Sequence, residues 1–408
     1  MQFLAPEQLG FRRWFLALGI ILCTFVYSNA LADSTDQAKR LHDRIAGVPP
    51  SATTLTNMQN AIDSGDAIGA ALIATQAPEF YNVTLKNFVA PWTNRDFSVF
   101  VPLDDYIATI IGIVRDDVDF REILFGDIIY TGSGSGIPAY NSNSNAHYEA
   151  LENSGVDLQA NLTQSTQSAV TGLPPEATAG VMTTRSAAKA FFIDGTNRAM
   201  FRFTMVNHLC RDMEEVHDVS RVPDRIRQDV SRSPGGDSRV FLNNCIGCHS
   251  GMDGLAQAFA YYDYEYDAVG DPDANNGAIH YNTPNDLDPI TGTQVEAKYY
   301  NNNLNFEHGY ITPDDGWINY WRDGPNKLLG WDESLPATGN GAKSMGQELA
   351  NTDAFAHCQV EKVFENVCLR PPQDSADRSQ VATMVTSFRS GYNLRQTFAE
   401  AAVYCMGN

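Results

Sequence analysis

Apolar residues recur at helical intervals in several stretches of the chain. The clearest stretch is 347–369, where one face carries Leu349, Phe355, Val360, Val363, Phe364 and Val367. Stretches 54–77, 198–219, 375–388 and 394–406 show similar spacing. No long stretch alternates polar and apolar residues with the period of two that a half-buried strand requires. The pattern therefore predicts a mainly α protein.

Polar stretches divide the predicted helices into two groups. Residues 132–145 are rich in Gly, Ser and Asn and predict a solvated loop, and the stretch Gly172-Leu-Pro-Pro175 is a second break. Residues 263–341 hold few helix formers and predict a long loop region with a short hairpin. We therefore expect a helical N-terminal domain over 33–172 and a second helical domain over 173–408, which carries the loop region as an insertion.

The first 32 residues have the pattern of a secretory signal peptide. Arg12 and Arg13 precede an apolar run over 14–27, and Ala30-Leu31-Ala32 supplies small residues for cleavage. The run is shorter than the roughly 20 residues that a membrane span needs. The sequence predicts a cleaved signal over 1–32 and a periplasmic or extracellular mature chain without a membrane span.

One short motif carries specific chemistry. Cys245 and Cys248 lie three residues apart, and His249 follows directly. On the first turn of a helix, two such cysteines meet the vinyl groups of a haem and the histidine faces its iron, which is the c-type attachment pattern. A zinc half-site needs a second ligand pair, and a redox dithiol needs a βαβ context; the sequence offers neither. The motif predicts one covalent haem c, attached by the haem c maturation machinery.

The remaining cysteines of the mature chain predict two disulfides. Four are left beside the motif, an even number for an oxidising compartment: Cys210, Cys358, Cys368 and Cys405. Ten residues of helix span about 15 Å, whereas bridged Cα atoms lie within about 7 Å. Because 347–369 is predicted to be one helix, Cys358 and Cys368 should pair with Cys210 and Cys405, in an order that the sequence leaves open.

The second axial position of the iron has several candidates. Met252 is excluded because it lies one turn from His249 on the same side of the haem. Downstream candidates are His280, His308, Met345, His357, Met384 and Met406. Met345 is the preferred distal ligand, because a flexible approach over 341–346 resembles the loops that carry distal methionines. A methionine ligand raises the potential and suits electron transfer.

Two further features concern charge. The haem propionates need donors, and five arginines precede the motif: Arg185, Arg198, Arg202, Arg211 and Arg239. The chain has a formal net charge of −21, which argues against nucleic acid as a partner and favours a basic redox partner. The plainer interpretation is that acidity keeps an exported protein soluble.

Several short stretches resemble the planctomycete-type multi-module cytochrome c proteins. They are Arg44-Ile-Ala-Gly-Val-Pro-Pro50, Phe120-Arg-Glu-Ile-Leu-Phe-Gly-Asp127, the haem motif with Met252-Asp253, and Phe355-Ala-His-Cys358 with Val363-Phe364. This chain departs from that family in being far shorter and in its extra cysteines. The resemblance implies a haem protein with a cytochrome c-like helical domain and little about any substrate.

The sequence thus predicts an exported monohaem cytochrome that transfers electrons. One alternative is a haem-containing redox enzyme or accessory subunit with an open sixth iron position. Another is a binding module in which the haem is structural.

Overall fold

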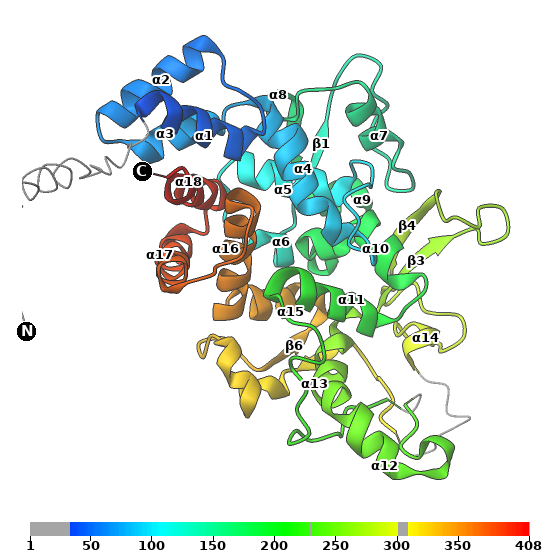
Figure 1. The fold of residues 1–408 in the computed structure, drawn as a ribbon. Coiled ribbons are helices and arrows are strands. Elements are labelled where there is room, and N and C mark those ends of the chain that lie inside the picture. The colour runs from blue at the N-terminus through cyan, green and yellow to red at the C-terminus, as the bar shows by residue number, and fades with distance from the viewer. Residues whose placement is uncertain (1–32, 228–229, 301–308, 408) are drawn as a thin grey trace, which may run out of the picture.

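The protein is mainly helical, as the sequence predicts. The computed structural model describes residues 33–227, 230–300 and 309–407. Helix makes up 55% and strand 8% of the structure, which confirms the predicted fold class. The predicted signal peptide over 1–32 and the candidate ligand His308 lie outside the described residues. Figure 1 shows α1 to α3 beside α18 at one end of the molecule and α12 and α13 at the other.

The helices fall into an N-terminal series and a second series. The first comprises α1 (Ser34–Ala46), α2 (Ala52–Asp63), α3 (Ala67–Ala74), α4 (Lys86–Val89), α5 (Asp105–Arg115), α6 (Glu122–Phe125), α7 (Ala146–Asn153), α8 (Leu158–Asn161) and α9 (Gln167–Thr171). The second comprises α10 (Arg185–Phe192), α11 (Asn197–Thr204), α12 (Ser238–Val240), α13 (Ile246–Ala256), α14 (Ala297–Tyr300), α15 (Gly341–Ala350), α16 (Asp353–Cys368), α17 (Ser375–Gly391) and α18 (Leu394–Cys405).

Within the part of the chain that the structure describes, three small antiparallel sheets lie among these helices. Strand β1 (Ile129–Gly132) pairs with β2 (Leu162–Ser165), β3 (Tyr262–Tyr266) with β4 (Gly277–Tyr281), and β5 (Gly316–Ile318) with β6 (Thr338–Asn340). The β3–β4 hairpin stands at the start of the predicted loop insertion over 263–341.

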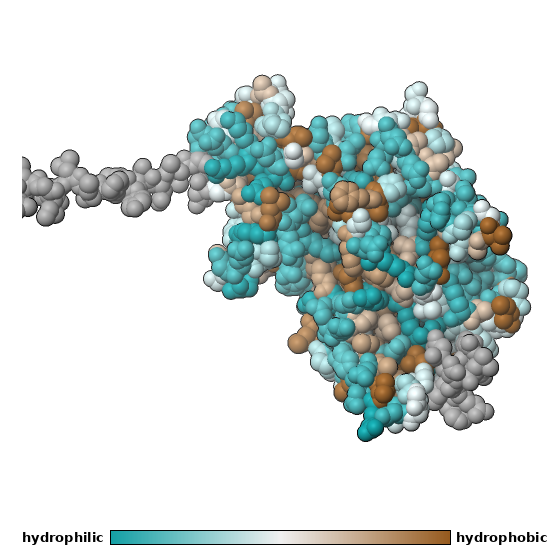
Figure 2. Space-filling view, turned by 45° about the vertical axis from the view of Figure 1, so that its right-hand side comes forward, coloured by the Kyte–Doolittle hydropathy of each residue, from teal (hydrophilic) through white to brown (hydrophobic). Residues whose placement is uncertain are grey.

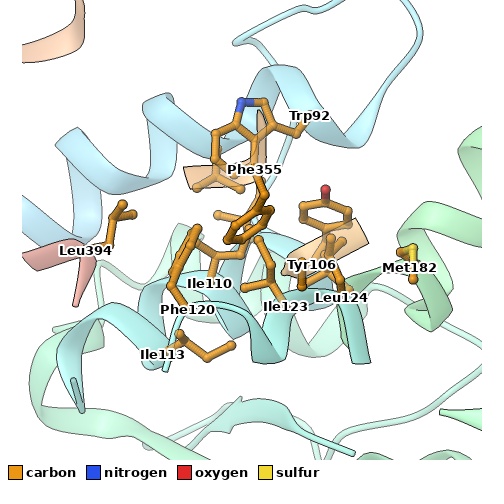
Figure 3. Packing of buried hydrophobic residues seen from close by; sticks show 14 of the residues in the cluster. Trp92, Tyr106, Ile110, Ile113, Phe120, Ile123, Leu124, Met182, Phe355 and Leu394 are labelled. Carbon is orange, nitrogen blue, oxygen red and sulfur yellow. The ribbon is translucent and has the colours of Figure 1, made fainter. Parts of the chain in front are cut away.

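A shared apolar core connects segments that lie far apart in the sequence. In Figure 3, Phe355 of α16 packs among Ile110, Phe120 and Ile123 from the N-terminal series. The ring centroids of Phe120 and Phe355 are 6.4 Å apart. The same cluster contains residues from both predicted domains, 33–172 and 173–408. The boundary between those domains stays a prediction.

Two predicted helices end earlier than the spacing indicates. The stretch 347–369 forms two helices, because Thr352 leaves the helical conformation and caps α16 by accepting a hydrogen bond from the Phe355 amide. The stretch 198–219 is helical only to Leu209, because Cys210 adopts a left-handed conformation with φ of 54°. Residues 211–218 instead form a segment of turns and irregular backbone that lies beside the first turn of α13. The single-helix predictions for 347–369 and 198–219 are therefore wrong at these points.

The four described cysteines outside the motif lie in two pairs at disulfide distance. Cys210 pairs with Cys358, and Cys368 pairs with Cys405, with Cα–Cα distances of 5.3 and 5.5 Å. Both cysteines of α16 therefore find partners outside that helix, as the spacing argument predicts, and the structure supplies the order that the sequence leaves open.

The surface carries mostly polar residues. On the face shown in Figure 2, hydrophobic residues are scattered among hydrophilic ones. Within the described residues, no helix combines the length and the apolar character that a membrane crossing needs.

Candidate functional site

The motif of Cys245, Cys248 and His249 lies where one helix begins. A π-helical turn, Phe241–Cys245, leads directly into α13. The sulfur-bearing and imidazole side chains are partly exposed, namely those of Cys245, Cys248 and His249. Their neighbours within the same turn are buried, namely Ile246, Gly247 and Ser250. At 3.6 residues per turn, this pattern places the two cysteines and the histidine on one side of α13. The buried residues of the turn lie on the opposite side.

Glycines form the buried side of α13. Gly247, Gly251 and Gly254 recur at helical spacing, opposite the functional side chains. A Cβ atom at Gly251 would lie 1.9 Å from Nε1 of Trp321, and one at Gly254 would lie 2.8 Å from the Ile318 carbonyl oxygen. These glycines therefore let α13 lie closer to its neighbours than any residue with a side chain would allow.

His249 is held through one of its ring nitrogens. Its Nδ1 lies 3.0 Å from Oδ1 of Asp253, four residues along α13. The Asp253 side chain is fully buried, and Arg198 of α11 contacts both of its oxygens, with Nε 2.7 Å from Oδ1 and Nη2 2.8 Å from Oδ2. With a carboxylate as acceptor, Nδ1 of His249 carries the proton and donates this hydrogen bond, which leaves Nε2 of His249 available to a metal.

The charge of Asp253 is stabilised despite its burial. Burial by itself raises the pKa of this carboxyl, but the Arg198 guanidinium and the hydrogen bond from His249 outweigh it and hold the pKa well below its usual range. Asp253 is therefore a charged acceptor for His249 at neutral pH.

The two motif cysteines are chemically distinct from the other four. Cys245 and Cys248 are unbridged. Cys245 packs against a small apolar cluster of Ile226, Phe241 and Ile246, separate from the main core. Burial raises the pKa of the Cys248 thiol, and the carboxylates of Glu214 and Asp212 raise it further. A raised pKa is the opposite of what a reactive dithiol requires.

A segment before the motif runs along the first turn of α13. The Cys248 thiol donates to the Met213 carbonyl at 3.4 Å, and the Asp218 amide donates to the Gly247 carbonyl at 3.0 Å. The imidazole of His217 covers Gly247. This position is on the side of α13 away from His249, so His217 is not placed to face a haem iron. Because the apolar spacing of 198–219 predicts helix here, these contacts could not be found from the sequence.

The arginines considered for the propionates have other contacts. Arg198 binds Asp253, Arg202 binds Asp212 and Arg239 binds Asp237. Arg185 is buried and donates to the carbonyls of Asn275 and Gly277, and Arg211 donates to the Cys210 carbonyl. Arg198, Arg202 and Arg211 lie on the segments that pack beside the motif. The assignment of a propionate partner stays open.

The candidate distal ligands are dispersed over the fold. Met345 is fully buried on α15, which begins at Gly341, so the predicted flexible approach over 341–346 is instead helical. A Cβ atom at the next residue, Gly346, would meet the Leu124 carbonyl oxygen, so this part of α15 packs on α6. Met384 is buried on α17 and His357 is exposed on α16. The remaining described candidates are partly buried: His280, which contacts Asn282, and Met406.

The donor set at the motif fits a haem c. Two free thiols and an imidazole with one nitrogen available lie on one partly exposed side of a helix turn. Among the described residues, no group of three or more His, Cys, Asp or Glu side chains is arranged to hold a metal ion.

Comparison with known proteins gives no match. No family model fits the chain, and neither a curated protein nor a solved structure resembles it to a significant degree. The resemblance to the planctomycete-type cytochromes therefore stays a prediction based on short motifs.

Proposed function

We propose that this chain is an exported c-type cytochrome that transfers electrons through one haem c. Cys245 and Cys248 would hold the haem by thioether bonds, and His249 would bind its iron through Nε2. The bound haem would supply an iron that cycles between the ferric and ferrous states.

The observation that carries the proposal is the placement of the three motif side chains. They share the partly exposed side of one helix turn, while the turn's other residues are buried. Because these side chains are partly exposed, the point at which they would hold a haem is accessible to a redox partner. The buried glycines on the opposite side fix α13 against Trp321 and Ile318, so the attachment point is rigid.

The test of haem attachment uses two cysteine pairs of the same chain. Unmodified protein, denatured and run on a gel, should retain haem-dependent peroxidase staining. The variant Cys245→Ala with Cys248→Ala should lose it completely. The matched control, Cys368→Ala with Cys405→Ala, also removes two cysteines but should keep the stain. Loss of haem from the unmodified protein in acid acetone would refute covalent attachment.

The sixth iron position separates the carrier from the enzyme. A carrier exchanges electrons fastest when both axial ligands are held in both oxidation states. With Met345 in that role, ferric protein should show the weak near-infrared methionine-to-iron band, and Met345→Ala should lose the band and lower the potential. Rapid carbon monoxide binding by the unmodified ferrous protein would favour the alternative, a haem enzyme with an open position.

The surface beside Cys248 favours a basic electron-transfer partner. Asp212 and Glu214 lie close enough to Cys248 to raise its pKa, and the whole chain is strongly acidic. Electrostatic attraction of this kind speeds association and weakens with salt. Electron exchange with a cationic reagent should therefore slow as ionic strength rises, while exchange with an anionic reagent should accelerate. The reverse dependence would contradict a basic partner.

A further inference from the structure

A buried ion pair stands directly behind the proposed axial histidine. Nδ1 of the His249 imidazole contacts a carboxylate oxygen, Oδ1 of Asp253, at 3.0 Å. The side chain of Asp253 has no exposed surface, and that of Arg198 is 15% exposed. Because water is excluded, the charge on Asp253 acts on the imidazole with little screening.

The position of this carboxylate is fixed from two sides. Helical spacing places Asp253 one turn beyond His249 on α13. Arg198 of α11 donates a hydrogen bond from its planar guanidinium to each of the two carboxylate oxygens. The start of α11 is itself tied to the end of α13, because Asn197 Nδ2 donates to the Ala256 carbonyl at 2.9 Å. The acceptor for His249 is therefore held in place before any ligand binds.

A charged acceptor has a chemical consequence for a metal-bound imidazole. A histidine that donates its second N–H to a carboxylate becomes a more basic ligand, because the ring gains imidazolate character. A more basic ligand stabilises ferric iron more than ferrous iron, so the reduction potential falls. Arg198 limits this effect, because its Nε shares the same oxygen, Oδ1, that His249 uses.

We infer that Asp253, gripped by Arg198, is a positioning residue that orients His249 and lowers the reduction potential of the iron bound to it. The inference rests on the proposed function, since it requires haem at the motif. It goes beyond that function by assigning the residues that set the potential.

The chain contains a matched control for this pair. Arg202 contacts Asp212 with the same fork geometry, Nε to Oδ1 at 2.7 Å and Nη2 to Oδ2 at 2.6 Å. Asp212 directly precedes Met213, whose carbonyl contacts the Cys248 thiol. Asp212 is 39% exposed, however, and has no contact with His249. Its removal therefore tests loss of a nearby charge without loss of the histidine's acceptor.

The experiment is a redox titration of purified holoprotein followed by its visible spectrum. Asp253→Asn should raise the midpoint potential by at least about 59 mV, a tenfold change in the one-electron equilibrium. Asp253→Glu keeps the charge and should restore part of the shift, whereas Asp212→Asn should change the equilibrium less than threefold. Equal shifts in Asp253→Asn and Asp212→Asn would overturn the inference.

A second variant decides the matter if Asp253→Asn does not accumulate as holoprotein. Arg198→Lys keeps the buried positive charge but cannot grip both oxygens, so Asp253 should bind His249 more strongly and the potential should fall. An unchanged or raised potential would overturn the inference. Absence of covalent haem from the unmodified protein is a separate outcome, since it would refute the proposed function itself.

Discussion

The six cysteines of the described chain serve two different regions. Four of them are paired and tie together helices of the main core, where Cys358 and Cys368 are 1% and 7% exposed. The other two, Cys245 and Cys248, are unbridged and partly exposed on the first turn of α13. Proteins in an oxidising compartment usually bridge their cysteines. For the exported protein that we propose, two unbridged thiols beside a histidine favour a different use.

The contrast extends to the surroundings of each region. Between α16 and α18 the packing is apolar, with rings such as Phe364 and Tyr404 in contact. Around α13 the packing is one-sided, with glycines against tryptophan behind and partly exposed functional groups in front. The first region is stabilised by its disulfides and apolar packing, and the second, in the function that we propose, would be the rigid attachment point of the haem.

The largest stability effect should come from the paired cysteines. Cys210–Cys358 closes a loop of 148 residues and Cys368–Cys405 one of 37. In the chain-entropy model, replacing both members of each pair with Ala should cost about 5 and about 4 kcal/mol respectively. Urea unfolding measures both losses.

The two disulfide variants should also differ at the haem. The segment after Cys210 contacts Cys248, so Cys210→Ala with Cys358→Ala should broaden the haem absorption bands, while Cys368→Ala with Cys405→Ala should not. Losses below about 1 kcal/mol for both pairs would contradict the assigned role of the disulfides.

Replacing one glycine in each region with alanine should change the stability by a smaller amount, and with opposite sign in the two regions. Gly251→Ala drives a methyl group into buried Trp321 and should destabilise the protein by about 1–3 kcal/mol. A methyl group at Gly391, at the end of α17, would meet no neighbouring atom within 4 Å, so Gly391→Ala should gain about 0.5 kcal/mol. Thermal unfolding of both variants compares them directly. Equal effects would show that α13 is not closely backed by Trp321.

The buried carboxylate at α13 also differs from one at the start of α5. Asp253 of α13 faces an arginine of α11, whereas Asp104, which caps α5, faces a second carboxylate, Asp105. Burial and the charge of Asp105 raise the pKa of Asp104 from 3.8 to about 7. Since the folded-state pKa is the higher one, the contribution of Asp104 to stability is complete below pH 3.8 and is lost as the pH rises through about 7.

Removal of this charge should therefore stabilise the protein at high pH. Asp104→Asn keeps an oxygen that can accept the Ile107 amide, and it should gain about 1–3 kcal/mol at pH 8 with little change at pH 4. Asp66→Asn is the control, because Asp66 caps α3 in the same way but is exposed. A gain at pH 8 no greater than that of the control would show that Asp104 is not destabilised by burial.

Much of the fold is predictable from local pattern. The two C-terminal helices, α17 and α18, agree with the predicted stretches 375–388 and 394–406 to within three residues. Their apolar residues recur without interruption, and turn residues flank them. The pairing of Cys358 and Cys368 with outside partners follows from helix geometry alone, because both residues do lie on α16.

The helix ends are less predictable, because they depend on single residues and tertiary contacts. Nothing in the spacing of 198–219 marks Cys210 as the point where the helix stops, since its left-handed conformation accompanies a contact with Cys358, far away in sequence. Thr352 is a recognisable cap, but the apolar pattern continues across it.

At the candidate site, the sequence identifies the residues that could bind a haem, and the structure identifies the residues that hold them in place. The motif identifies Cys245, Cys248 and His249 without any fold. The spacing of His249 and Asp253 by four residues is the signal that could have assigned Asp253 its contact. Arg198 could not be chosen among five arginines, because its contact with Asp253 depends on how α11 packs on α13.

The central claim is that one haem is covalently bound through Cys245 and Cys248, and the most direct measurement is the mass of the denatured, unmodified protein. The account predicts the mass of the polypeptide plus one haem, with both motif cysteines protected from alkylation and the added mass on the peptide that contains them. A mass equal to the polypeptide alone, with Cys245 and Cys248 free to react, would contradict the account.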